Sequence, residues 1–131
     1  MMIIPDVVAD QEVRTLRPDQ TAYDAAQLMT AHNISAVIVV DDNDRLAGIV
    51  TERDLSRRVV AQDRKGSELK LGEIMTEDPA ALRPEDNAAH AMETMRNLKI
   101  RHLPVVKDDK VVGMVSIRDL RHSLSRAIVT V

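Results

Sequence analysis

Two short segments place a hydroxyl and a carboxylate three positions apart: Thr51 with Asp54, and Ser116 with Asp119. In each segment an apolar run ends at the hydroxyl residue, so a strand is expected to end and a helix to begin there. At such a corner the carboxylate can accept hydrogen bonds from both hydroxyls of a ribose. The hydroxyl side chain and the first N–H groups of the helix can donate toward a phosphate. The chemistry that this pattern allows is recognition of a nucleotide.

The same pattern has a purely structural interpretation. A Ser or Thr at the start of a helix commonly caps it, and an acidic residue three positions later completes a capping box. Asp54 and Asp119 would also suit the positive end of the helix dipole. Arg53 and Arg118, which precede the two acids, are typical of a solvated helix face. From these residues alone, capping and nucleotide recognition both stay open.

The two segments belong to a longer internal repeat. Residues 48–55 read GIVTERDL and residues 113–120 read GMVSIRDL. Upstream, Arg17-Pro18-Asp19 aligns with Arg83-Pro84-Glu85, and the register continues through the apolar positions with a single one-residue shift in a turn. A match of this length, with Gly, Pro and Asp also aligned, indicates a duplicated unit rather than chance similarity of apolar runs.

Each copy predicts the order strand, helix, strand, strand, helix, because short β-branched runs alternate with apolar residues at helical spacing. We expect strands at residues 13–16, 36–40 and 46–50 and again at 80–82, 103–106 and 111–115, helices after the caps Thr21 and Asn87, and helices beyond each corner to about Val59 and Leu124. One copy would bury little apolar surface, so the two copies are expected to pack sheet to sheet. The predicted fold class is α/β (α+β), with two β-α-β-β-α repeats.

The domain boundaries follow from the repeat. Residues 1–61 are expected to form the first repeat and residues 71–131 the second. The charged segment at residues 62–70, which contains Gly66, is expected to be the linker between them.

The composition excludes several classes of function. The net charge is −3 and the chain has one Tyr and no Phe or Trp, so neither a basic surface nor stacking platforms for nucleic acid are expected. No apolar run approaches the ~20 residues that cross a bilayer. The first residues, MMIIPDVV, lack the basic start of a signal peptide. We therefore expect a soluble, cytoplasmic protein without nucleic-acid or membrane partners.

Catalysis and metal binding are not expected either. The sequence has no Cys, its four His residues include no pair four positions apart, and no nucleophile–base pair or Gly-rich phosphate loop is found. The run at residues 41–44, DDND, matches a calcium loop only in composition and is better explained as a turn between two strands. The chain is predicted to be no enzyme and to require no cofactor.

The whole pattern resembles a tandem pair of CBS (cystathionine beta-synthase) domains, known as a Bateman module. The resemblance is carried by the two G-h-h-[ST]-x-x-D-h segments, where h is apolar, and in the second repeat by EIMTEDPAALRPED and KIRHLPVV. The first repeat departs from it, with DVVADQEV in place of EIMTEDPA. The resemblance implies a pseudo-two-fold axis between the repeats. It also implies that the Ser/Thr-x-x-Asp of one repeat faces the strand lead-in of the other and binds an adenosine-containing ligand.

Carried over to this chain, the resemblance implies two clefts. One would contain Ser116 and Asp119 with Val13, Arg14, Ile34 and Ser35, and the other Thr51 and Asp54 with Ala80, Ala81, Ile100, Arg101 and His102. Ile34 and Ile100 would clamp the adenine ring. Arg101 and a protonated His102 could hold phosphate. The second cleft is therefore expected to favour phosphorylated ligands.

The predicted function is a non-catalytic regulatory or energy-sensing module. It would bind AMP as the first candidate, or ADP, ATP, NAD or S-adenosylmethionine, and transmit binding to an unidentified protein partner. A homodimer is expected, since two-fold dimers are the commonest assembly. The alternative is a protein-interaction or dimerisation module whose nucleotide clefts are vestigial.

Overall fold

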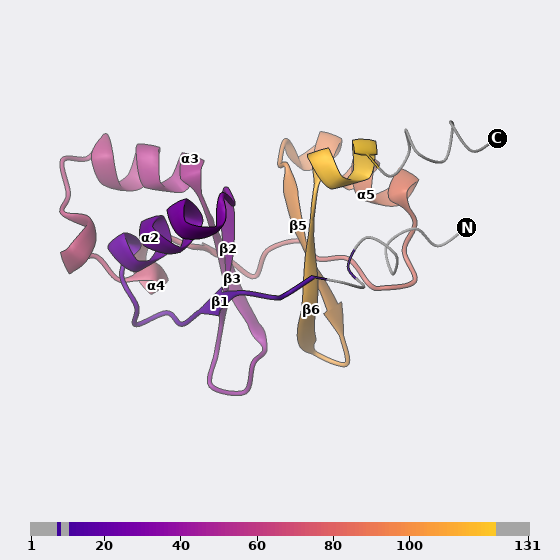
Figure 1. The fold of residues 1–131 in the computed structure, drawn as a ribbon, viewed down its shortest axis with the longest axis horizontal. Coiled ribbons are helices and arrows are strands. Elements are labelled where there is room, and N and C mark those ends of the chain that lie inside the picture. Colours follow the sequence, from indigo (N-terminus) through magenta and orange to yellow (C-terminus); the bar gives the residue numbers. More distant parts are fainter. Residues whose placement is uncertain (1–7, 9–10, 123–131) are drawn as a thin grey trace. The chain divides into compact units, whose positions relative to one another are not determined.

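The computed structural model describes Val8 and residues 11–122, and these divide into two units (Figure 1). One unit is Arg14–Pro79, and the other runs from Ala80 onward and includes the described residues before Arg14. The unit boundaries therefore differ from the repeat boundaries expected above. Residues 62–79 lie in the same unit as most of the first repeat, and the described residues before Arg14 lie in the same unit as most of the second. The expected helix end at Leu124 lies outside the described residues.

The unit Arg14–Pro79 is a four-stranded sheet with helices on one side of it (Figure 1). The strand order is β1-β2-β3-β4; β1 is parallel to β2 and the other pairs are antiparallel. The elements are β1 (Thr15–Leu16), α2 (Ala22–His32), β2 (Ala36–Val40), β3 (Leu46–Thr51), α3 (Glu52–Asp54), the π-helix η1 (Leu55–Val60), the 3₁₀-helix η2 (Gly66–Glu68), α4 (Leu71–Ile74) and β4 (Thr76–Glu77).

The other unit repeats the pattern. It contains α5 (Ala88–Leu98), the antiparallel pair β5 (His102–Lys107) and β6 (Lys110–Ser116), and a helix at residues 117–122. The predicted strand at 80–82 is reduced to a parallel bridge between Leu82 and Val105. The predicted α/β repeat is confirmed in both units.

The two cores explain why small apolar residues recur at the same helical positions. In α2 the buried residues are Ala22, Ala25 and Met29, and in α5 they are Ala88, Ala91 and Met95. Ala lets each helix lie close to its sheet, and the longer Met fills the space near the helix end. Both helices then stop at a residue in the left-handed conformation, which ends the helical hydrogen-bond pattern.

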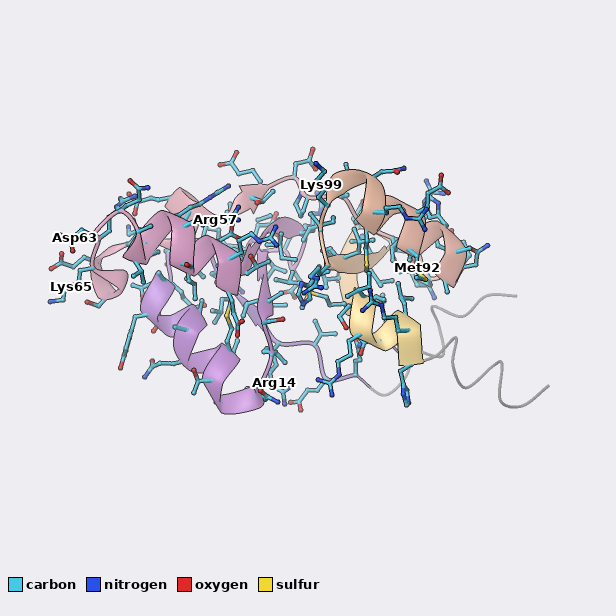
Figure 2. All side chains as sticks on the ribbon, turned by 90° about the horizontal axis from the view of Figure 1, so that it is seen from above. Arg14, Arg57, Asp63, Lys65, Met92 and Lys99 are labelled. Carbon is cyan, nitrogen blue, oxygen red and sulfur yellow. The ribbon has the colours of Figure 1, made fainter. Side chains whose placement is uncertain are left out.

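The segment expected to be a linker packs in part against α2. Leu69 is buried in the core, its carbonyl accepts the N–H of Ala22, and Gly66 approaches Tyr23. The charged residues at 61–65 are exposed, and Asp63 and Lys65 mark this loop in Figure 2. The connection between the repeats is therefore anchored on the first unit, and only its charged loop projects into solvent.

Each sheet also receives an edge from the first segment of the other repeat. In the first unit β4 pairs with β3, so that Glu77 lies opposite Gly48. In the second, the side-chain amide of Gln11 donates to the Met114 carbonyl at 2.7 Å and accepts the Met114 N–H at 3.0 Å. The side chain of Gln11 thus makes the edge contacts on β6 that β4 makes on β3. The two repeats thus exchange their first segments, and each exchanged segment lies in the unit whose sheet it covers.

The turn between β2 and β3 is closed by Asp41. Its Oδ1 accepts the N–H groups of Asn43 at 2.8 Å and Arg45 at 3.0 Å. The backbone N–H groups of Arg45 and Asn43 hold the pKa of Asp41 below its ordinary value, since they favour the ionised carboxylate. This geometry supports the interpretation of the run at 41–44 as a turn.

The turn between β5 and β6 offers a test of stability. Asp108 and Asp109 both have positive φ, 52° and 66°, as a two-residue type I′ hairpin requires. Because Gly reaches this conformation without strain, Asp109→Gly is expected to raise the free energy of unfolding by about 0.5–1 kcal/mol, measured by urea denaturation. Asn43→Gly, in the other turn at a residue without positive φ, should give no gain. A lower urea midpoint for Asp109→Gly would contradict this account of the turn.

Candidate functional site

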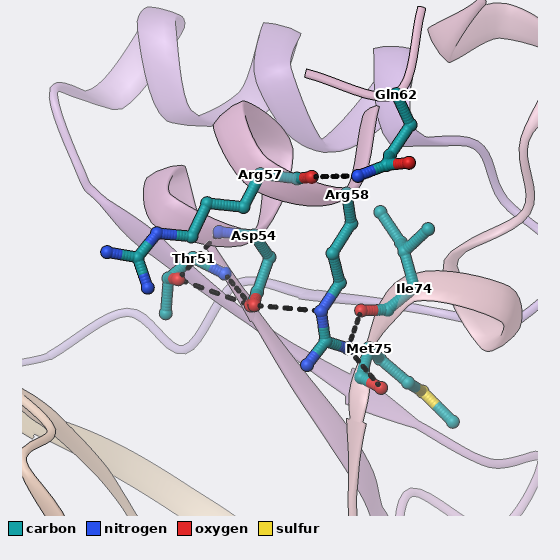
Figure 3. Close-up of polar contacts among 7 residues, drawn as sticks. All are labelled: Thr51, Asp54, Arg57, Arg58, Gln62, Ile74 and Met75. Atoms are coloured by element: carbon teal, nitrogen blue, oxygen red, sulfur yellow. Dashed lines mark hydrogen bonds and ion pairs between the residues drawn. The ribbon is translucent and has the colours of Figure 1, made fainter. Parts of the chain in front are cut away.

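The first candidate corner lies where β3 ends and α3 begins. The Thr51 hydroxyl accepts the N–H of Asp54 at 3.2 Å, and Asp54 Oδ2 accepts the Thr51 N–H at 2.9 Å and its hydroxyl at 3.2 Å (Figure 3). The Asp54 side chain is 14% exposed. A β-branched run that ends at a hydroxyl residue thus places both side chains at the strand–helix junction.

The second corner has the same geometry at the end of β6. The Ser116 hydroxyl accepts the N–H of Asp119 at 3.0 Å, and Asp119 Oδ2 accepts the Ser116 N–H at 3.0 Å. Both residues are half-buried. The capping interpretation of the two segments is therefore confirmed.

Capping occupies only one oxygen of each acid. Every hydrogen bond to Asp54 and Asp119 within the described part of the chain goes to Oδ2. In both corners Oδ1 therefore has lone pairs available for another donor. The capping role leaves an acceptor at each corner and does not exclude ligand binding.

A third capping box shows what is particular to the two corners. At the start of α2, Thr21 and Asp24 exchange the same two hydrogen bonds, at 3.1 Å and 3.0 Å. In the second repeat, Asn87 caps α5 and His90 stands where the acid would be. The acid at the start of α2 is thus not repeated, whereas the acid of the corner is present in both copies.

Arg58 distinguishes the first corner and was missed by sequence reasoning. Its Nε lies 3.7 Å from Asp54 Oδ1, and its Nη1 donates to the carbonyl of Ile74 at 2.7 Å (Figure 3). The spacing of four between the acid and Arg58 is a usable signal, because such pairs meet on a helix surface. The carbonyl partner on α4 has no signal in the sequence.

The strand lead-ins lie beside the corner of their own repeat. The carbonyl of Ser35 accepts the N–H of Glu52 at 3.0 Å, and that of Arg101 accepts the N–H of Ile117 at 2.9 Å. Ile34 and Ile100 are half-buried, and each packs against the core of its own unit. The structure thus brings the lead-in and the corner together within each repeat, and the groupings across the repeats stay predictions.

The remaining predicted site residues are distributed over both units. Val13 is 36% exposed, and Ala81 and Arg101 are exposed. Arg14, Ala80 and His102 are half-buried. Of the cationic residues expected to contact phosphate, Arg101 is exposed, whereas Arg14 and His102 are half-buried.

Among the residues that the structure describes, no three His, Asp or Glu side chains come together in a way that could hold a metal ion. None of the helices resolved there has the length and apolar character that crossing a membrane requires.

Two α/β repeats, each with a capped Ser/Thr–Asp corner between its last strand and its last helix, define a tandem-repeat module of the CBS type. The family model "CBS domain" matches residues 5–61 and 71–126, and the chain belongs to this family. The resemblance noted from the sequence is thereby confirmed.

Relatives span a range of organisms. The chain is 44% identical over 106 residues to "CBS domain-containing protein CBSX3, mitochondrial" of Arabidopsis thaliana, a match that covers 78% of this chain and 52% of that protein. The chain thus spans about half the length of this relative. The structure of a protein with CBS domains from Burkholderia ambifaria MC40-6 has 35% identity and a TM-score of 0.85, with 91% of this chain and 90% of that one covered.

Ligands are present in some of the similar structures. The CBS domain pair of protein MJ0100, in complex with 5′-methylthioadenosine and S-adenosyl-L-methionine, has 27% identity and a TM-score of 0.83. The match covers 95% of this chain and 96% of that one.

Proposed function

We propose that this chain is a non-catalytic regulatory module that binds an adenosine-containing ligand at its Ser/Thr–Asp corners. The observation that carries the proposal is that the hydrogen bonds to Asp54 and Asp119 in the described part of the chain all go to Oδ2, so that Oδ1 of each acid can still accept a ligand hydroxyl. The ligands of the MJ0100 domain pair are both adenosyl compounds, which supports this class of ligand.

The acid of each corner would bind the ribose of a ligand through hydrogen bonds. Its vicinal hydroxyls donate, and a carboxylate oxygen that is half-buried and not hydrogen-bonded is a strong acceptor for them. The adenine ring would lie against Ile34 or Ile100 in clefts between the repeats. Arg14, Arg101 and His102 would face the 5′ substituent. An adenosyl compound can therefore be recognised without any aromatic side chain.

The identity of the 5′ substituent separates the candidate ligands. Arg101 and His102 favour a phosphate, as in AMP, which is the first candidate, with ADP, ATP and NAD as variants. S-Adenosylmethionine and 5′-methylthioadenosine lack phosphate and would bind through the ribose and adenine alone. Tighter binding of AMP than of adenosine would indicate that the cationic residues contact the 5′ phosphate of the ligand.

Thermal and urea unfolding with each compound tests the proposal. A ligand that binds the folded chain at a hundred times its Kd adds about 2.7 kcal/mol to the free energy of unfolding. We expect such a gain with at least one of AMP, ADP, ATP, NAD, S-adenosylmethionine and 5′-methylthioadenosine, and none with 2′,3′-dideoxyadenosine, which lacks the ribose diol. No gain with any of them would reject nucleotide binding.

A second candidate is an interaction or dimerisation module with vestigial clefts. It is favoured by the capping geometry, which gives Thr51, Asp54, Ser116 and Asp119 a structural role without any ligand. Tyr23, Val60 and Leu98 are also exposed apolar side chains that a second chain could cover. A homodimer in sedimentation together with no effect of any adenosyl compound would favour this candidate.

A further inference from the structure

Arg58 joins two elements that are distant in the sequence. Its Nε lies 3.7 Å from Asp54 Oδ1, and its Nη1 lies 2.7 Å from the carbonyl oxygen of Ile74 and 3.5 Å from that of Met75 (Figure 3). One guanidinium thus contacts both the candidate ligand acceptor and the end of α4.

The carbonyl end of α4 needs such a partner. The last carbonyls of a helix have no partner within the helix, and Arg58 satisfies one of them. Directly after Met75 the chain enters β4, which pairs with β3 at Gly48 and then leads out of the first unit. Arg58 therefore fixes the start of the segment that connects the two units.

The contact with Asp54 differs from the contact with Ile74 in strength. At 3.7 Å, Nε is too far from Oδ1 for a hydrogen bond, and the side chain of Arg58 is 50% exposed, so this ion pair is weak. The contact at 2.7 Å is a hydrogen bond from a charged donor. A ligand hydroxyl that binds Asp54 Oδ1 would therefore approach an oxygen that has an ion pair with Arg58 but no hydrogen bond from it.

We propose that Arg58 couples the Asp54 corner to the α4–β4 segment. A hydroxyl bound to Asp54 Oδ1 would change the strength of the hydrogen bonds from Arg58 to the Ile74 and Met75 carbonyls. The ligand step rests on the function proposed above, whereas the link through Arg58 does not. In the repeat alignment Arg58 falls on Ser123, so no arginine stands at this position in the second repeat. We assign the coupling to the first corner.

Hydrogen exchange without ligand tests the link. Arg58→Gln is expected to speed amide exchange at residues 75–78 by about threefold to tenfold, since a charge-assisted hydrogen bond to the segment is lost. Arg57→Gln is the matched control. It removes the same charge one residue earlier, and among the described residues its side chain makes no hydrogen bond or ion pair with Asp54, Ile74 or Met75. Arg58→Lys keeps the charge and should restore part of the protection.

A double-mutant cycle separates coupling from a merely structural role. Asp54→Asn should change exchange at residues 75–78 when Arg58 is present and leave it unchanged in the Arg58→Gln background. Equal effects of Asp54→Asn in both backgrounds would overturn the link.

The same measurement with 5′-methylthioadenosine and AMP completes the test. Either compound, once bound, should alter exchange at residues 75–78 in the natural chain and in Arg57→Gln, and should not do so in Arg58→Gln. Binding to the natural chain without a change at residues 75–78 would overturn the coupling. If neither these nor the other adenosyl compounds bind, the proposed function fails, and the ligand-free cycle still decides whether Arg58 joins the two elements.

Discussion

Asp119→Asn is expected to weaken binding of an adenosyl ligand by about tenfold to a hundredfold, the range for losing a hydrogen bond to a charged acceptor. The cap needs an acceptor, so the amide oxygen of Asn takes the place of Oδ2 opposite the Ser116 N–H. The amide nitrogen then replaces Oδ1, and it is a donor that cannot accept a ribose hydroxyl. Asp54→Asn is expected to act in the same way at the other corner. Isothermal titration calorimetry with AMP and 5′-methylthioadenosine measures both effects.

A matched control lies in the same chain. Asp24→Asn makes the same chemical change in the capping box of α2, which shares the hydrogen-bond geometry of the corners. It is expected to leave the affinity unchanged and to alter the unfolding midpoint as little as the corner variants do. Wild-type affinity in the double variant Asp54→Asn/Asp119→Asn would show that neither acid binds the ligand.

The fold was predictable because its signals are local. A β-branched run such as residues 36–40 is too short for a helix, and all five of its residues are buried in β2. Thr21 and Asn87 both cap helices, as their side-chain type and position indicated. The duplication then supported each assignment with a second copy.

The features that sequence reasoning missed depend on contacts between distant residues. Arg58 and Ile74 are 16 positions apart, and Gln11 and Met114 are 103 apart. No periodicity indicates that Gln11 pairs with a strand edge, because its side-chain amide, and not a strand backbone, makes the two hydrogen bonds to Met114. The π-helix at Leu55–Val60 was missed for a related reason. In its widened turn the Ala61 N–H is bonded to the Ser56 carbonyl, a rare helix geometry that the spacing of apolar residues does not indicate.

The candidate site was predicted in its residues and less completely in its geometry. The residue types allowed both capping and ligand binding, and only the hydrogen bonds show that capping uses Oδ2 of Asp54 and Asp119 and leaves Oδ1. Spacing alone cannot assign roles to the two oxygens of one carboxylate.

The glycine that opens each repeated octapeptide is explained by the exchanged edges. A Cβ at position 48 would lie 2.8 Å from the carbonyl oxygen of Thr76 and 2.6 Å from Met75 Sδ. A Cβ at position 113 would lie 2.7 Å from Val8 Cγ1 and 3.0 Å from Gln11 Oε1. In both units only glycine lets the edge segment approach so closely. The repeated Gly thus marks where a segment from outside the repeat covers the sheet.

Gly48→Ala is therefore expected to lower the free energy of unfolding by about 1–3 kcal/mol, the usual cost of overpacking a tight contact. The loss should exceed that of Gly113→Ala, because at position 48 a backbone carbonyl must move, whereas at position 113 the close atoms belong to side chains. Urea denaturation of the two variants gives the midpoints, with an unchanged slope showing that the same surface is exposed on unfolding.

Gly66→Ala is the matched control for Gly48→Ala. Its added Cβ would lie 3.5 Å from the nearest atom, the Tyr23 nitrogen, and no described glycine has positive φ, so alanine fits without strain. The free energy of unfolding should stay the same or rise slightly, since alanine restricts the unfolded chain. If Gly48→Ala and Gly66→Ala shift the midpoint equally, the β4 segment does not press on Gly48. The exchanged edge would then be a loose association, and Arg58 would have no rigid element to act on.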